Sequence, residues 1–274
     1  MAMKLIFVSN YYTHHQAPIC EEFFSQTDSS FSFIETEKME IERLSMGWDF
    51  LEKPSFVKDY RVEPEYCQML IDNADIVIYG SAPKSLFEYR LKKGKITFFY
   101  SERIYKKGFK WYKWPAHFFR FYFWFRRYSN QYLLAASAFA CADYHKTYTF
   151  VNKSFKWGYF PETRIYDDFS MVTRKKKEFR LKHHVDVSIL WVARLIRLKH
   201  PEVMIELAKK LRADGIVFKM SIAGDGELMP ELKKEIEQNR LEKYIELLGN
   251  VNPQEIRDVM EKHDIFLFTS DKNE

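Results

Sequence analysis

Apolar runs alternate with amphipathic stretches along most of the chain. Short apolar runs bounded by turn-forming or charged residues predict buried strands, and apolar residues three or four positions apart predict helices. This alternation is typical of an α/β fold built on parallel sheets. The expected strands cover residues 4–10, 31–37, 75–80, 95–102, 187–194, 217–224, 244–250 and 264–270, and a strand end followed by a small-residue helix is expected across 132–146.

The pattern is interrupted near residues 165–186, which are rich in charge and have no clear periodicity. We therefore expect two Rossmann-like domains, residues 1–165 and 187–274, joined by a linker over residues 166–186. The Rossmann strand order would arrange the four strands of the second domain as 3-2-1-4. Residues 264–270 would then form an edge strand that is apolar on both faces, which is a hazard for pairing with other chains.

The composition excludes a disordered or collagen-like chain, because 46% of the 274 residues are hydrophobic. The net charge of +5 fits an anionic ligand, a membrane surface or nucleic acid, so it decides little. The first ten residues turn polar too soon for a secretory signal, and no run of apolar residues is long enough to predict a transmembrane helix. Three widely spaced cysteines predict free thiols in a reducing cytosol; they are Cys20, Cys67 and Cys141.

Ligands of open α/β sheets bind at the carboxyl ends of the strands. After the strand at 187–194 the chain carries Arg194, Arg197 and Lys199, just before a helix is expected to begin. Cations beside a helix N-terminus suit a diphosphate leaving group, because they neutralise the charge that develops as the glycosidic bond breaks. A solvated loop whose basic side chains contact water is the alternative.

Two further loops at the same edge carry weaker signals. Gly224 and Gly226 allow close backbone approach, although an ordinary tight turn would use the same residues. Asn250 and Val251 follow the next strand and could offer backbone groups to a nucleobase, although a plain strand-to-helix turn explains them equally well.

The order of these elements resembles the donor-binding domain of the retaining family 4 glycosyltransferases, which have the GT-B fold. The matching segments are VARLIRLKHPE, SIAGDGEL and IELLGNVNPQEIRDVMEKHDIFLFTSDKNE. The resemblance implies that Arg194 and Lys199 bind the donor diphosphate. It also implies that Glu274 is the first glutamate of the Glu-x7-Glu motif and contacts the donor hexose. The second glutamate would lie beyond this chain, which predicts a truncated and inactive fragment.

The resemblance reaches the N-terminal half more loosely. MKLIFVSNYYTHHQAP is similar to the first strand and acceptor-side loop of such enzymes, particularly those of bacterial surface-polysaccharide clusters. His14 and His15 lie in that loop, where a side chain could contact the acceptor or the leaving phosphate, and a structural role for them is equally well supported. Ser81 is a further acceptor-side candidate. Many members of the family have a histidine after the strand that matches residues 95–102, where this chain has Glu102. That glutamate could position the acceptor hydroxyl, or pair with Arg103 or a nearby lysine.

Residues 109–128 combine aromatic and basic side chains and allow two interpretations. The segment could lie at a membrane surface, with its rings in the headgroup region and its cations on anionic lipid. It could instead be a helix whose rings form core. The rings occur on every helical face after Phe118, which slightly favours burial or an oligomer contact.

The expected activity is transfer of a hexose from a nucleoside-diphosphate sugar to a glycan or lipid-linked acceptor, with retention and without a metal or further cofactor. A nucleotide-sugar epimerase of similar fold and a non-catalytic binding or scaffold module stay open. A Rossmann dehydrogenase is disfavoured, because no Gly-x-Gly-x-x-Gly follows either opening strand. No nucleic-acid partner is expected. A homodimer through the edge strand and a peripheral place at the inner membrane face are options for a cytoplasmic protein.

Overall fold

The computed structural model describes residues 3–45, 47, 48, 50, 52–106 and 108–270. The chain divides into two compact units, Met1–Thr163 (unit 1) and Arg164–Glu274 (unit 2). Each unit is built on its own parallel sheet. The expected α/β class with two Rossmann-like sheets is therefore confirmed.

Unit 1 contains a seven-stranded sheet in the order β3-β2-β1-β4-β5-β6-β7, and all of its strand pairs are parallel. The strands are β1 (Leu5–Ser9), β2 (Phe31–Glu35), β3 (Val57–Asp59), β4 (Ile76–Tyr79), β5 (Thr97–Ser101), β6 (Gln131–Ala135) and β7 (Ser154–Lys156). The helices are α1 (Ala17–Gln26), α2 (Ile41–Ser45), α3 (Pro64–Asn73), η1 (Lys84–Phe87), α4 (Glu88–Lys92), η2 (Trp111–Lys113), α5 (Trp114–Arg126) and α6 (Ala140–His145). The short outer strands β3 and β7 carry too few apolar residues to be recognised in the sequence.

The central strand β1 shows why this sheet is covered on both faces. Leu5 and Phe7 join one buried cluster, which includes Ala17 and Cys20 of α1. Ile6 and Val8 point to the other face and join a cluster that includes Cys67 of α3. Because side chains alternate across a strand, a strand buried on both faces must be continuously apolar, and that is the pattern seen in the sequence.

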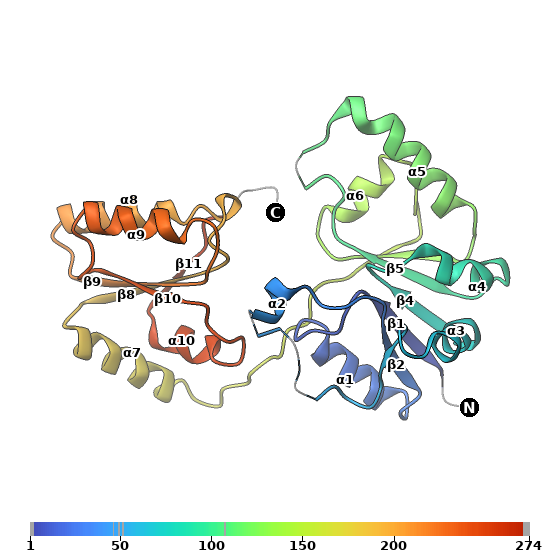
Figure 1. The fold of residues 1–274 in the computed structure, drawn as a ribbon, viewed down its shortest axis with the longest axis horizontal. Helices are drawn as coiled ribbons and strands as arrows, with labels where there is room; N and C mark the ends of the chain where they lie inside the picture. Colours follow the sequence, from blue (N-terminus) through green and yellow to red (C-terminus); the bar gives the residue numbers. More distant parts are fainter. Residues whose placement is uncertain (1–2, 46, 49, 51, 107, 271–274) are drawn as a thin grey trace. The chain divides into compact units, whose positions relative to one another are not determined.

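Unit 2 contains a four-stranded parallel sheet in the order β10-β9-β8-β11 (Figure 1). The strands are β8 (Val187–Val192), β9 (Phe218–Ala223), β10 (Ile245–Gly249) and β11 (Ile265–Leu267). The helices are α7 (Ser170–His183), η3 (Arg197–Lys199), α8 (Glu202–Ala213), α9 (Met229–Gln238) and α10 (Ile256–Lys262). Helices α8 and α9 cover one face and α7 and α10 the other. The expected order 3-2-1-4 is confirmed, with β11 at the edge of the sheet among the described residues.

The linker expected over residues 166–186 is largely the helix α7, so this interpretation is wrong. Its residues are mostly exposed, which leaves little apolar periodicity to recognise. Ion pairs help to hold the helix in place, together with a contact between the rings of Phe179 and the buried His263, whose centroids are 4.6 Å apart. Lys175 bonds Glu261 of α10 at 2.6 Å, and Arg180 bonds Asp264 at 2.7 Å.

Two further expectations concern the whole chain. All three cysteines are free, as predicted; Cys20 and Cys67 are buried and Cys141 is half-buried. Burial raises the pKa of the Cys67 thiol to about 11, which makes it unreactive at neutral pH. Among the helices that the structure describes, none combines the length and apolar character that a membrane crossing requires.

Candidate functional site

The carboxyl edge of the unit 2 sheet gathers four loops, because its strands are all parallel. Two of these loops are locked together by the glycines that follow β9. A Cβ atom at Gly224 would lie 1.9 Å from the carbonyl oxygen of Ala193, and one at Gly226 would lie 2.5 Å from that of Leu195. The backbone N–H of Leu195 donates to the carbonyl of Asp225 at 2.9 Å. The backbone at these two glycines therefore packs directly against the backbone of the loop that carries Arg194.

The basic loop after β8 is also held from its other side, by the residues that follow β11. The hydroxyl of Thr269 donates to the carbonyl of Lys199 at 2.6 Å and accepts from the indole N–H of Trp191 at 2.9 Å. The Lys199 ammonium lies 4.9 Å from the ring centroid of Phe268. Arg194 is exposed at this edge. The sequence analysis missed Thr269 and Trp191, whose part-buried hydrogen bond orients the hydroxyl that holds the backbone carbonyl of Lys199.

The loop after β10 completes this edge. The carbonyl of Gly249 accepts from the N–H of Gly224 at 2.7 Å, so this loop adjoins the glycine loop. Asn250 is exposed and Val251 half-buried directly after it. The predicted donor residues of three loops are thus brought to one edge of one sheet. Glu274, the remaining predicted donor residue, lies outside the described residues.

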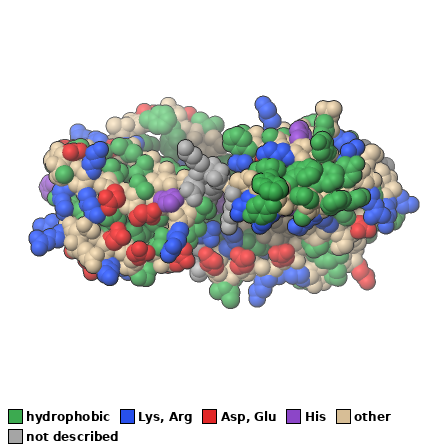
Figure 2. Space-filling view, turned by 90° about the horizontal axis from the view of Figure 1, so that it is seen from above, with side chains coloured by type: hydrophobic (Ala, Val, Ile, Leu, Met, Phe, Trp, Pro, Cys, Tyr) green, Lys and Arg blue, Asp and Glu red, His purple; other side chains and the backbone are tan. Residues whose placement is uncertain are grey.

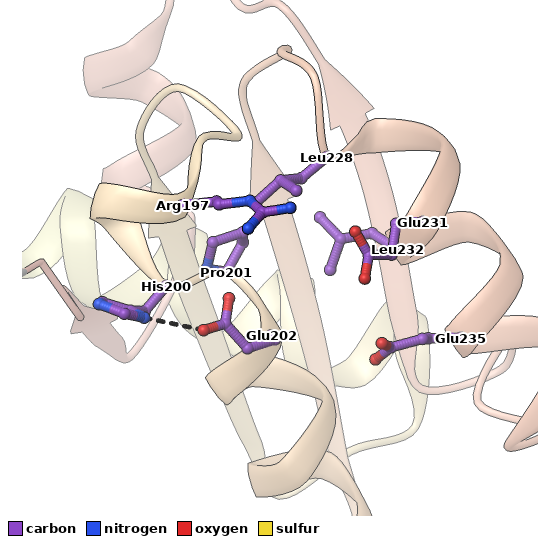
Figure 3. A pocket seen from close by; sticks show the side chains of 8 residues that line it. All are labelled: Arg197, His200, Pro201, Glu202, Leu228, Glu231, Leu232 and Glu235. Atoms are coloured by element: carbon purple, nitrogen blue, oxygen red, sulfur yellow. Dashed lines mark hydrogen bonds and ion pairs between the residues drawn. The ribbon is translucent and has the colours of Figure 1, made fainter.

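A pocket of about 400 Å³ lies beside this edge, between the start of α8 and α9 (Figure 3). Its lining residues are Arg197, His200, Pro201, Glu202, Leu228, Glu231, Leu232 and Glu235. Arg197 projects into it over Leu228. Three carboxylates face a single guanidinium here, so the pocket repels a diphosphate. The exposed Arg194 and the half-buried Lys199 of the same loop are not opposed by these carboxylates and are better placed for such a ligand.

The strand order of unit 1 reverses between β1 and β4, which marks the expected ligand crevice of that sheet. The loop after β1 is anchored there by the buried carboxylate of Glu35. This carboxylate accepts the backbone N–H of Tyr12 at 3.3 Å and the ammonium of Lys53 at 2.9 Å. Ser81 is exposed in the loop after β4. The acceptor-side residues predicted from the sequence thus occupy loops at one edge.

His14 and His15 are packed against each other and against an indole. Their ring centroids are 4.0 Å apart, and both lie about 5 Å from the ring of Trp48 (5.2 and 5.1 Å). The ring of His15 also lies 6.4 Å from that of Tyr159. Trp48 and Tyr159 extend this cluster beyond the residues that the sequence indicated, because they come from segments far away in the chain.

Glu102 connects the same cluster to β5. Its carboxylate accepts a hydrogen bond from the hydroxyl of Tyr159 and forms an ion pair with Lys106. Arg103, the other partner considered for it, pairs instead with the buried Asp143 at 3.2 Å. The structure therefore brings Glu102 and His15 together through Tyr159.

His14 is held in its neutral form. Burial, with a smaller contribution from His15, lowers the pKa of His14 to about 4. Its Nδ1 atom is buried with no hydrogen-bond partner among the described residues. At neutral pH the side chain therefore offers one N–H donor and one nitrogen acceptor, not a cation for a phosphate.

We expect His14 to titrate near pH 4, and we expect the protein to lose stability between pH 6.5 and about 4. Over this range the unfolded chain binds a proton at His14 and the folded chain does not, so acidification favours unfolding. NMR of the imidazole resonances and urea unfolding at several pH values measure both effects. The variant His14→Gln serves as the control and should show a flatter stability profile. A titration midpoint near 6.5 for His14 would contradict this expectation.

Comparison with known proteins finds similarity in the unit that carries the basic loop. Residues 173–274 match the family described as glycosyl transferases group 1. The amylovoran biosynthesis glycosyltransferase AmsK of Erwinia amylovora is 37% identical over 87 residues, which are 32% of this chain and 21% of that protein. The putative colanic acid biosynthesis glycosyltransferase WcaL of Salmonella typhimurium is 34% identical over 84 residues, 31% of this chain and 21% of that one. The matched stretch thus spans about a fifth of each relative.

Solved structures extend the similarity over the whole chain. Anabaena HepE, solved with UDP-glucose, superposes with a TM-score of 0.63 at 13% identity, and the match covers 98% of this chain and 74% of that one. WaaG, a glycosyltransferase involved in lipopolysaccharide biosynthesis, gives a TM-score of 0.59 at 12% identity, over 97% and 75%. At such low identity the similarity shows the fold. That fold is the one of GT-B glycosyltransferases, as the sequence predicted.

Proposed function

We propose that this protein is a glycosyltransferase that moves a hexose from a nucleoside-diphosphate sugar to a hydroxyl of a glycan or lipid-linked acceptor, with retention at the anomeric carbon. One observation carries the proposal. Arg194 and Lys199 lie on a loop that two glycines and Thr269 hold at the carboxyl edge of the sheet, inside the segment that matches group 1 glycosyl transferases.

The basic loop would act on the leaving group. As the bond between the anomeric carbon and the diphosphate oxygen breaks, its electron pair stays on the diphosphate, which gains negative charge. Positive side chains held in place before the reaction stabilise that charge without reorganising. Arg194 and Lys199 would supply this stabilisation, so the proposed reaction needs no metal ion.

The acceptor side of the proposal rests on unit 1. The acceptor hydroxyl must lose its proton as its oxygen bonds to the sugar. The neutral imidazole of His14 and the carboxylate of Glu102 are both able to accept a hydrogen bond from a hydroxyl. The aromatic rings of Trp48 and Tyr159 beside them provide apolar surface for a sugar ring. We also propose a cytoplasmic location, which the three free cysteines support.

A thermal-shift panel tests the donor assignment. We expect a matching nucleoside-diphosphate sugar, and the free nucleoside diphosphate, to raise the Tm of this chain, because a ligand that binds the folded state stabilises it by RT ln(1 + [L]/Kd). The corresponding monophosphate should raise it less, because it lacks the second phosphate for the basic loop. EDTA should leave these shifts unchanged.

The same panel can contradict the proposal. If no nucleoside-diphosphate sugar in the panel raises the Tm, the donor assignment is wrong. If the shifts disappear with EDTA, a metal ion and not the basic loop holds the diphosphate. Once a donor is found, NMR of the product with a hydroxyl acceptor reports the anomeric configuration, and inversion would remove the retaining assignment.

A further inference from the structure

Helix α5 has two different aromatic faces. Phe125 is 4% exposed and packs in the core of unit 1 with Phe121 and Trp124. On the opposite face Phe119 and Phe123 are 57% and 64% exposed, with ring centroids 6.0 Å apart. Positions four apart lie on one helical face, so Phe119 and Phe123 share the outer face of α5. The core interpretation of the segment is thus correct for one face of the helix and not for the other.

The segment before α5 carries further exposed rings. Phe109, Trp111 and Tyr112 are exposed there, Trp111 at 79%. We call these three rings with Phe119 and Phe123 the ring surface. Figure 2 shows hydrophobic side chains gathered in the region that α5 occupies, with Lys and Arg side chains around them. Contiguous exposed apolar surface of this kind marks an interaction site.

The charge around the ring surface has one sign. From Arg103 to Ala142 the sequence contains eight Lys and Arg residues and no Asp or Glu. Exposed members of this set alternate with the rings along the sequence; they are Lys106, Lys110, Lys113, Arg120, Arg126 and Arg127. A surface of this kind attracts a polyanion and repels a second copy of itself.

A pocket of about 300 Å³ adjoins the ring surface. It is lined by Arg103, Ile104, Tyr105, Lys106, Gly108, Lys110, Lys113 and His117. Arg103 is balanced by Asp143 and Lys106 by Glu102. Lys110 and Lys113 add positive charge that these two carboxylates do not offset.

Two of the residues that line the pocket have a buried polar atom without a hydrogen-bond partner among the described residues. Tyr105 is 3% exposed, and its hydroxyl is buried with no hydrogen-bond partner among the described residues; the same holds for Nδ1 of His117. The two rings are stacked, with centroids 5.4 Å apart. A buried polar atom without a partner costs free energy, so a ligand that bonds to it gains affinity. Two such atoms beside two lysines fit the oxygens of a phosphate group.

We propose that this pocket binds the headgroup phosphate of an anionic membrane lipid while the ring surface enters the headgroup region beside it. Trp and Tyr rings favour the membrane interface, phenylalanine side chains favour its apolar side, and basic side chains bind lipid phosphates. The pocket and the rings occupy one continuous segment, so both can meet the same bilayer surface. This inference does not depend on the proposed transferase activity.

Vesicle sedimentation tests the proposal on the 274-residue chain. We expect binding to phosphatidylcholine vesicles that contain about a third phosphatidylglycerol at 50 mM NaCl, and loss of that binding at 500 mM NaCl or with pure phosphatidylcholine, because salt screens surface charge. Phe119→Ser with Phe123→Ser should weaken binding about tenfold or more, because two apolar side chains no longer leave water. Tyr89→Ser, which changes another ring of unit 1 that is 56% exposed, is the matched control and should bind normally.

Tyr105→Phe distinguishes a ligand site from a structural role. The variant removes a hydroxyl that has no protein partner among the described residues. We expect unchanged or higher stability in urea together with several-fold weaker vesicle binding. Lower stability with unchanged binding would mean that the hydroxyl serves the fold, and it would remove the headgroup pocket from the proposal.

Other results would overturn the inference as a whole. The first is no binding to anionic vesicles at 50 mM NaCl. The second is binding by the Phe119→Ser, Phe123→Ser double variant that equals binding by the unchanged protein.

Inorganic phosphate that competes fully with vesicles at micromolar concentration would point to a soluble phosphate ligand. Tighter binding of single-stranded RNA with the same residue dependence would assign a nucleic acid. Dimerisation abolished by the Phe variants would assign self-association. The donor-induced Tm shift should be the same in all these variants, which separates this test from the proposed function.

Discussion

Replacing Gly224 by Ala is expected to destabilise unit 2 by about 3 kcal/mol or more. The new Cβ would lie 1.9 Å from the carbonyl oxygen of Ala193, where backbone and not a flexible side chain must move. Overpacking of this kind costs roughly 1–3 kcal/mol. The φ of +139° adds backbone strain of about 1–3 kcal/mol for a residue with a side chain. Urea unfolding measures the loss.

Gly215→Ala is the matched control for this variant. Gly215 also has a positive φ, of +72°, but a Cβ there meets nothing within 4 Å. It should cost only the conformational strain of about 1–2 kcal/mol. Hydrogen exchange should then show faster exchange in the loops after β8 and β9 for Gly224→Ala only. Equal destabilisation by both variants would mean that the two loops do not need to be in close contact.

Replacing Arg194 or Lys199 by Ala in the full-length enzyme is expected to lower kcat of the transfer reaction steeply. Each side chain is proposed to stabilise charge on the leaving diphosphate, which is worth about 2–4 kcal/mol for one such group, or roughly 30- to 1,000-fold in rate. The unfolding free energy should change little for Arg194→Ala, because Arg194 is exposed. Steady-state kinetics with the donor found in the thermal-shift panel provide the measurement.

Lys210→Ala removes an exposed cation from α8 and is the control for net charge. It should leave kcat unchanged. In the two loop variants the Tm shift produced by the nucleoside diphosphate should also decrease. Near-normal kcat in both Arg194→Ala and Lys199→Ala would remove these residues from the reaction, and the diphosphate would then have to be sought elsewhere in unit 2.

The sequence determined that both sheets are parallel and, for unit 2, the order of the strands. Continuous apolar strands such as Leu5–Ser9 and Val187–Val192 can satisfy both faces only in a covered parallel sheet. A parallel sheet in turn places the loops after β8, β9 and β10 at one edge, so the sequence is enough to predict the candidate donor residues. The strand order of unit 2 followed from the same rule.

Helix α7 could not be recognised from the sequence, because contacts between charged residues hold it. Lys175 and Glu261 lie 86 positions apart, and no local sequence pattern predicts their contact. The role of Gly224 was equally hidden, because only the fold shows that its backbone meets Ala193 and not solvent. The neutral state of His14 depends on burial beside Trp48, which is distant in the chain.

The aromatic segment at residues 109–128 shows most clearly what the sequence determines and what only the tertiary structure determines. The sequence placed rings on every face of residues 114–126 and so left burial and membrane contact undecided. The tertiary structure decided between faces, because Phe125 packs in the unit 1 core with Phe121 and Trp124 whereas Phe119 and Phe123 stay exposed. Local sequence fixes which residues share a helix face, whereas only packing against distant strands fixes which face is left to solvent.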